Sequence, residues 1–319
     1  MVFNQASGFT RPSPTGTGLF LFCLILTSCS GMKNPDRQSP ASEAEGYFLT
    51  VRDGVKIFVS EHLPADGSKN TIYIFSGITG VNHNNEKDLI GLLSNRENRV
   101  VVIHPRGTGY SEGTRGDTDP GTIIADYSEV ILSDSSYYSG NIILYGHSMS
   151  CAFALEVAGK LPEADGVILV NPPYKLKPAK GMSPGFSNYL KYIGYYLFAP
   201  HASIVNMAGD PSLIGDESDR MESEQRNNDS LLVKYFSMRC MADSKKIMNA
   251  MLENASRTDS PLLLLYGEND NIIDQSGCDE IYSAWKGRNK SYVIIKGGSH
   301  GKSTVLKGAE IITKWIENI

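Results

Sequence analysis

Short runs of apolar residues recur along the chain from about residue 47 onward, each five or six positions long. Gly, Pro or Asn bounds them, and most are continuously apolar rather than alternating, which is typical of strands buried on both faces of a parallel sheet. The predicted strands span residues 47–51, 55–60, 71–75, 99–103, 141–145, 166–170, 261–266 and 291–295. The first two flank the sequence Arg52-Asp53-Gly54, which favours a tight hairpin turn.

Segments with helical character lie between these strands, at residues 123–132, 149–161, 279–286 and 304–317. Strands that alternate with helices predict the α/β class, with a mostly parallel, doubly wound sheet. We expect one such domain to span residues 46–319.

The interval between Pro172 and Pro261 interrupts this alternation, because no strand is evident in it. It contains an aromatic helix candidate, an acidic loop-like stretch and a further helical stretch, at residues 187–198, 209–224 and 230–254. An insertion of this length between two strands indicates a helical cap, at about residues 173–258.

The N-terminal segment differs from the rest of the chain. Residues 18–26 (GLFLFCLIL) form a nearly continuous apolar run, too short for a membrane-spanning helix of about 20 residues but typical of the h-region of a signal peptide. The run ends in Leu26-Thr27-Ser28-Cys29, which resembles the bacterial lipobox, whose Cys becomes the acylated N-terminus after cleavage. We therefore expect residues 1–28 to be a lipoprotein signal peptide and Cys29 to be the lipidation site.

Residues 29–45 are polar and poor in large apolar side chains, as a flexible tether would be. Acyl chains on Cys29 would attach the protein to a membrane without a spanning helix. By resemblance to bacterial lipoproteins, Ser30 in place of Asp favours the outer membrane of the cell envelope over the inner one. An ordinary cleaved signal, or a buried strand with an incidental Cys, is the alternative interpretation.

Composition narrows the possible partners. The chain has 30 basic and 35 acidic residues, a net charge of −5, and no basic stripe that could neutralise phosphates, so nucleic acid is excluded as a partner. Beyond the N-terminal segment, Cys151, Cys240 and Cys278 have neither C-x-x-C spacing nor His partners at zinc-like intervals. Neither a metal site nor a disulfide framework is therefore indicated.

The pentad Gly146-His147-Ser148-Met149-Ser150 follows one predicted strand and begins a predicted helix. It is close to G-x-S-x-G, in which small residues allow the sharp turn that exposes a nucleophilic Ser. Ser150 replaces the last Gly. Taken alone, the pentad could also be an ordinary strand-to-helix turn.

Two further candidate catalytic residues, Asp270 and His300, lie in loops that directly follow predicted strands. The carboxyl ends of parallel strands meet at one edge of a sheet, and open α/β sheets build their sites there. The order Ser148, Asp270, His300 predicts a nucleophile, an orienting carboxylate and a general base. Taken singly, Asp270 could be a turn residue and His300 a surface residue.

A tetrahedral intermediate also requires hydrogen-bond donors for its oxyanion. The backbone N–H of Met149, directly after the candidate nucleophile, is one predicted donor. The N–H of Ile78 is the other, in the loop Ser76-Gly77-Ile78-Thr79-Gly80 that follows a predicted strand.

Several segments together resemble the α/β-hydrolases of the monoacylglycerol lipase, lysophospholipase and serine aminopeptidase group. They are SGITG (76–80), HPRGTGYSEG (104–113), GHSMS (146–150), GEND (267–270) and GGSH (297–300). The resemblance implies an α/β-hydrolase fold and a serine hydrolase that uses neither a metal nor an organic cofactor. Ser76, His104 and Ser150 depart from the residues usual in the group, and none of these changes removes a proposed catalytic group.

The resemblance makes hydrolysis of a lipid ester, such as a monoacylglycerol or lysophospholipid, the first functional hypothesis. Tyr189, Tyr192 and Tyr196 could line an acyl pocket or could pack the cap on the core. A serine aminopeptidase is an alternative, with cap carboxylates holding a substrate ammonium; the acidic residues available are Asp210, Asp216, Glu217, Asp219, Glu222 and Glu224. We expect these six to form a solvated loop. A non-catalytic envelope protein that binds a ligand on the same scaffold is the third hypothesis.

Overall fold

The computed structural model describes residues 46–62, 68–80, 86–94, 97–135, 140–161, 164–178, 186–208, 210–214 and 216–319. The predicted signal peptide, the lipidation site Cys29 and the predicted tether lie outside these ranges. Across these ranges no helix combines the length and the apolar character that a membrane span requires.

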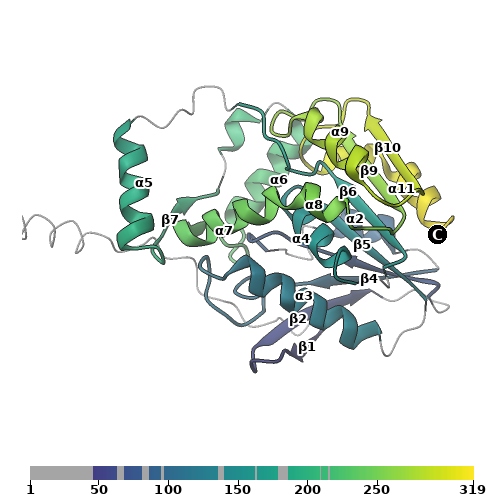
Figure 1. Cartoon of the computed structure of the whole chain (residues 1–319), viewed down its shortest axis with the longest axis horizontal. Helices are drawn as coiled ribbons and strands as arrows, with labels where there is room; N and C mark the ends of the chain where they lie inside the picture. The colour runs from purple at the N-terminus through teal and green to yellow at the C-terminus, as the bar shows by residue number, and fades with distance from the viewer. Residues whose placement is uncertain are drawn as a thin grey trace, which may run out of the picture.

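An eight-stranded sheet forms the centre of the molecule (Figure 1). Its strands are β1 (Gly46–Thr50), β2 (Lys56–His62), β3 (Asn70–Ile74), β4 (Asn98–Ile103), β5 (Asn141–His147), β6 (Gly166–Val170), β9 (Leu262–Gly267) and β10 (Lys290–Ile295). They lie in the order β1-β2-β4-β3-β5-β6-β9-β10, in which β2 is antiparallel to both of its neighbours, β1 and β4, and the six strands from β4 to β10 are parallel. All eight predicted strands are present, so the mostly parallel sheet is confirmed.

Helices cover both faces of this sheet (Figure 1). One apolar core includes side chains of α3 (Pro120–Ser135), α4 (Met149–Ala158), α8 (Met251–Ala255) and α9 (Gln275–Ala284). The other includes side chains of α2 (Lys87–Leu93), α10 (Lys302–Lys307) and α11 (Ala309–Ile316). In β9, Leu262 and Leu264 enter the first core while Leu263 and Leu265 enter the second. Strands buried on both faces explain the continuous apolar runs and confirm the doubly wound architecture.

The segment between β6 and β9 contains most of the remaining elements. They are α5 (Phe186–Phe198), β7 (Ser203–Asn206), η1 (Pro211–Leu213), α6 (Glu217–Asn228), β8 (Tyr235–Ser237) and α7 (Met238–Asn249). The expectation that no strand occurs here is wrong, since β7 and β8 pair antiparallel. These strands have only four and three residues, so no apolar run marks them in the sequence.

The expectation that the acidic residues 209–224 form a loop is also partly wrong, because α6 begins within this stretch. Asp216 accepts a hydrogen bond from the N–H of Asp219 at 3.2 Å and so caps the start of the helix. Glu217 and Asp219 in the first turn and Arg226 in the last suit the helix dipole. Charge placement, rather than apolar periodicity, accounts for this helix.

A buried ion pair fixes α3 against the sheet. Arg99 of β4 has a fully buried side chain and donates to both carboxylate oxygens of Asp134, at 2.6 and 2.9 Å. The hydroxyls of Tyr47 and Tyr73 donate to the same carboxylate at 2.8 and 2.6 Å. Burial opposes ionisation of Asp134, but the hydrogen bonds from Arg99 and Tyr73 outweigh it and hold the pKa of this carboxyl below its usual value.

Candidate active site

Ser148 occupies the sharp turn between β5 and α4. Its φ of +53° and ψ of −129° are costly for a residue with a side chain, and such strain is typical of a nucleophile elbow. The N–H of Ser148 donates to the carbonyl of Val170 at 2.9 Å, which ties the turn to the end of β6. A Cβ atom added to Gly146 would lie 2.7 Å from Cα of Cys151, so glycine is required there. The turn therefore holds the Ser148 side chain at the carboxyl edge of the sheet.

Ser150, which replaces the last glycine of the elbow pattern, closes the same turn. Its hydroxyl accepts a hydrogen bond from the N–H of His147 at 2.7 Å and donates one to the carbonyl of His147 at 2.8 Å. The side chain is buried. A serine here therefore supplies two contacts that glycine lacks, without displacing the elbow.

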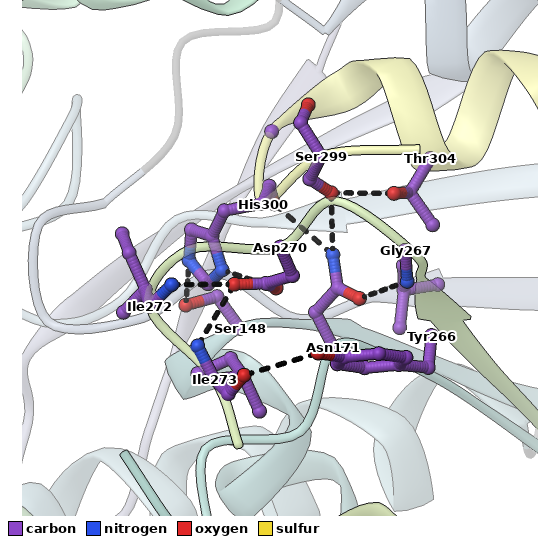
Figure 2. Close-up of polar contacts among 12 residues, drawn as sticks. Ser148, Asn171, Tyr266, Gly267, Asp270, Ile272, Ile273, Ser299, His300 and Thr304 are labelled. Atoms are coloured by element: carbon purple, nitrogen blue, oxygen red, sulfur yellow. Dashed lines mark hydrogen bonds and ion pairs between the residues drawn. The ribbon is translucent and has the colours of Figure 1, made fainter. Parts of the chain in front are cut away.

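The structure brings Ser148, His300 and Asp270 together in one relay (Figure 2). Oγ of Ser148 lies 2.9 Å from Nε2 of His300, and Nδ1 of His300 lies 2.9 Å from Oδ2 of Asp270. Because a carboxylate accepts hydrogen bonds, the proton of the neutral imidazole belongs on Nδ1. Nε2 is then free to accept the hydroxyl proton of Ser148, as a general base must.

Asp270 is buried and held in one orientation. Its Oδ1 accepts hydrogen bonds from the backbone N–H groups of Ile272 and Ile273, both at 2.8 Å (Figure 2). Burial alone would raise the pKa of Asp270, but the hydrogen bonds from His300 and the two backbone groups prevail and lower it. The carboxylate is therefore ionised at neutral pH and faces His300 through Oδ2.

The two predicted oxyanion donors lie beside the elbow. A Cβ atom added to Gly77 would lie 3.4 Å from Cβ of Met149, so the loop that carries Ile78 packs against the start of α4. The hydroxyl of Tyr127 fixes this loop by accepting from the N–H of Ser76 at 3.1 Å and donating to its carbonyl at 2.8 Å. Within the described part of the chain, the N–H groups of Ile78 and Met149 have no hydrogen-bond partner. Both are therefore available to an oxyanion.

One face of α6 contacts both loops of the site. Oδ2 of Asp219 accepts hydrogen bonds from the Ser299 hydroxyl and, at 3.2 Å, from the N–H of Gly301. Glu222, three residues further along α6, accepts a hydrogen bond from the N–H of Lys302 at 3.2 Å. Arg226, four residues beyond Glu222, donates a hydrogen bond to the hydroxyl of Thr79 at 3.1 Å. Asp219 is only 8% exposed, so the expectation of a solvated acidic loop is wrong for this residue.

Two polar residues that were not predicted from the sequence hold the His300 loop. Asn171, which directly follows β6, donates to the carbonyl of His300 at 3.2 Å, and Nε2 of His147 donates to the same oxygen at 2.7 Å. Burial and the nearby His300 lower the pKa of His147, which favours its neutral form. The position of Asn171, at the carboxyl end of a predicted strand, is the signal that could have identified it.

Two of the three predicted acyl-pocket residues are not brought to this relay. Tyr192 and Tyr196 of α5 are 39% and 45% exposed, and the side chain of Tyr189 lies outside the described residues. Their role in a pocket stays a prediction. In the ranges that the structure describes, no group of three or more metal-ligating side chains occurs. Three buried cysteines are free, Cys151, Cys240 and Cys278.

Several solved structures share this fold. A soluble variant of the monoglyceride lipase of Saccharomyces cerevisiae, in complex with a substrate analogue, is 16% identical, with a TM-score of 0.73 over 90% of this chain and 98% of that one. The monoacylglycerol lipase of Paleococcus ferrophilus is 21% identical, with a TM-score of 0.65 over 81% and 97%. An esterase of Exiguobacterium antarcticum is 17% identical, with a TM-score of 0.60 over 85% and 99%.

At these identities the structural likeness establishes the fold, which is that of α/β hydrolases. No protein of curated function has a significantly similar sequence. A family model, described as serine aminopeptidase, S33, matches residues 66–302, a span that includes Ser148, Asp270 and His300. The chain therefore belongs to the serine aminopeptidase S33 family and is a hydrolase with the α/β-hydrolase fold.

Proposed function

We propose that the protein hydrolyses carboxylic esters with Ser148 as the nucleophile, His300 as the general base and Asp270 as the orienting carboxylate. The observation that carries this proposal is the relay of two 2.9 Å contacts from Ser148 through His300 to Asp270. Its donors and acceptors match the direction in which the proton must move.

The reaction has two half-reactions. Oγ of Ser148 attacks the ester carbonyl carbon while Nε2 of His300 takes the hydroxyl proton. The N–H groups of Met149 and Ile78 stabilise the oxyanion of the tetrahedral intermediate. Its collapse breaks the bond to the alkoxy oxygen, which leaves as the alcohol with the proton from His300. Water, deprotonated by His300, then attacks the acyl-enzyme, and the carboxylic acid departs as Ser148 regains its proton.

A lipid ester, such as a monoacylglycerol or a lysophospholipid, is the substrate class that we propose. Two of the structurally similar proteins are monoglyceride or monoacylglycerol lipases. The helix α5, between β6 and β9, also presents large apolar side chains to solvent, Tyr192, Ile193, Tyr196, Leu197 and Phe198. An exposed apolar face on this inserted segment suits a substrate with a long acyl chain.

The aminopeptidase alternative requires carboxylates that are free to bind a substrate ammonium. Asp219 and Glu222 are the acidic residues of α6 that contact the His300 loop, but each accepts hydrogen bonds from that loop. One oxygen of each carboxylate is thus used within the protein, and the other oxygen of Asp219 is buried. The binding-protein alternative gives no reason for Ser148, His300 and Asp270 to be aligned. Ester hydrolysis is therefore the better supported function.

A series of p-nitrophenyl esters tests the substrate class. Each buried CH₂ group contributes about 0.8 kcal/mol, so an acyl pocket should favour octanoate over butyrate by more than about tenfold in kcat/KM. We expect this preference for the purified protein, together with labelling by a fluorophosphonate probe and slow turnover of aminoacyl arylamides. A short-chain optimum would exclude the lipid substrate, and faster arylamide turnover would favour the peptidase.

We also propose that acylated Cys29 anchors the protein in the bacterial cell envelope, at the outer membrane rather than the inner one. The apolar run at residues 18–26 and the lipobox-like tetrapeptide support this location. Cells fed an alkyne fatty acid should label the wild-type protein and a Cys23→Ala variant, whereas Cys29→Ala should lose the label. Equal labelling of the Cys29→Ala variant would contradict the anchor.

A further inference from the structure

Asn171 is a fully buried polar residue in an unusual backbone conformation. It directly follows β6, its exposed fraction is 0%, and its φ is +50°. Left-handed backbone is uncommon outside glycine, although asparagine tolerates it better than most residues. A buried amide is costly unless it is hydrogen-bonded, so the contacts of Asn171 show what it does.

The Asn171 side chain joins the loops that carry His300 and Asp270 (Figure 2). Its Nδ2 donates to the carbonyls of Ser299 and His300, at 3.0 and 3.2 Å. Its Oδ1 accepts the N–H of Gly267, the last residue of β9, at 2.8 Å. The loop with Asp270 begins at that glycine, so one amide holds both loops to the end of β6.

Other donors reach these carbonyls, but each reaches only one of them. Thr304 donates to Ser299, and His147 donates to His300. Among the described residues, Asn171 alone contacts both carbonyls, and it also holds β9. Asn171 therefore links the backbone on both sides of the contact between Nδ1 of His300 and Oδ2 of Asp270.

We propose that Asn171 is a positioning residue, which sets the orientation of His300 relative to Asp270 and Ser148. The proposal rests on the ester hydrolysis proposed above. Losing a hydrogen bond that aligns the base costs the transition state more than the bound substrate. Removing the amide should therefore lower kcat and leave KM nearly unchanged.

Two substitutions separate positioning from stability. Asn171→Gly removes the amide and suits a φ of +50°, whereas Asn171→Ala removes the same amide and strains the backbone. If Asn171 positions His300, both variants should lose about tenfold in kcat and in the rate of fluorophosphonate labelling. A tenfold loss of rate corresponds to about 1.4 kcal/mol in the activation free energy. We expect KM to stay within about twofold of wild type, and the alanine variant to unfold at a lower temperature.

A matched control lies at the opposite end of the parallel strands. Asn70 is buried at the start of β3, donates to the side chain of Asn98 at 2.8 Å and accepts from that of Asn141 at 2.9 Å. Asn70→Ala therefore removes side-chain hydrogen bonds between strands far from Ser148. We expect it to lower the unfolding temperature while kcat and the labelling rate stay at wild-type values.

The outcomes are distinguishable. If wild-type protein is labelled and both Asn171 variants react at the wild-type rate, the positioning role is wrong although the proposed function stands. The role is also wrong if kcat falls only in Asn171→Ala, or if it falls equally in Asn70→Ala, because loss of stability would then explain the effect. Folded wild-type protein that takes up no label would overturn the proposed function, and the role of Asn171 with it.

Discussion

Replacing Ser148 with alanine is expected to lower kcat for a p-nitrophenyl ester by about 10⁶-fold and to abolish fluorophosphonate labelling. Oγ of Ser148 is the atom that His300 contacts through Nε2, and alanine leaves that base without a nucleophile to activate. Any remaining rate would come from substrate binding and the oxyanion donors acting on water. Steady-state rates and labelling, both measured on protein with a native circular dichroism spectrum, provide the test.

Ser150 offers a matched control two residues along the same turn. Ser150→Gly removes the two hydrogen bonds to His147 and restores the small residue that the elbow pattern usually has. We expect this variant to be labelled, with a kcat within about tenfold of wild type. Labelling of the Ser148→Ala variant would show that another residue is the nucleophile. A Ser150→Gly variant that folds but takes up no label would show that the relay depends on residue 150.

The relay could be predicted from the sequence because each of its members directly follows a continuous apolar run. Strand β5 leads into Ser148, and the loops after β9 and β10 contain Asp270 and His300. The buried strands β5 and β9 appear in the sequence as continuous apolar runs, and parallel strands bring their carboxyl ends to one edge. No long-range contact had to be known for this part of the site.

The contacts of α6 could not be predicted in the same way. This helix has almost no apolar residues, and its buried member, Asp219, is held by hydrogen bonds to a loop 80 residues further along the chain. Apolar periodicity carries no information about such a helix, because polar contacts rather than apolar burial hold it in place. The strands β7 and β8 are too short to show a period at all.

Asn171 illustrates a second limit of sequence reasoning. Its place after β6 was visible, but an asparagine followed by two prolines is typical of a turn. Only the folded structure shows that its side chain is turned inward to Gly267 and His300. Candidate residues at strand ends can therefore be listed from sequence, whereas the partners of their side chains cannot.

Replacing Asp270 with asparagine is expected to lower kcat by about 10⁴-fold through the wrong His300 tautomer. The backbone N–H groups of Ile272 and Ile273 both point at Oδ1 and require an acceptor there. The carbonyl oxygen of the new amide must occupy that place, so its NH₂ group must face Nδ1 of His300. Nδ1 then accepts a hydrogen bond, the ring proton moves to Nε2, and Nε2 can no longer take a proton from Ser148.

The same substitution changes how stability depends on pH. Because the pKa of Asp270 is lower in the folded state than its usual value of 3.8, the ionised carboxylate stabilises the fold above that pH. This contribution is lost as the pH falls through the lower, folded-state pKa. The difference in free energy of unfolding between wild type and Asp270→Asn, measured by urea denaturation, should therefore change in favour of the variant as the pH falls below the usual pKa of an aspartate.

Asp274 supplies the matched control for the loss of kcat. It lies in the same loop, and its Oδ1 accepts a hydrogen bond from the N–H of Ser276 at 2.9 Å, which caps α9. Asn caps a helix about as well as Asp does, so Asp274→Asn should keep kcat at the wild-type value. If Asp270→Asn reduces kcat less than about tenfold, the tautomer argument fails, and another group must orient His300. The carbonyl contacts from Asn171 and His147 hold the backbone of His300 but do not reach Nδ1, so they cannot replace the carboxylate.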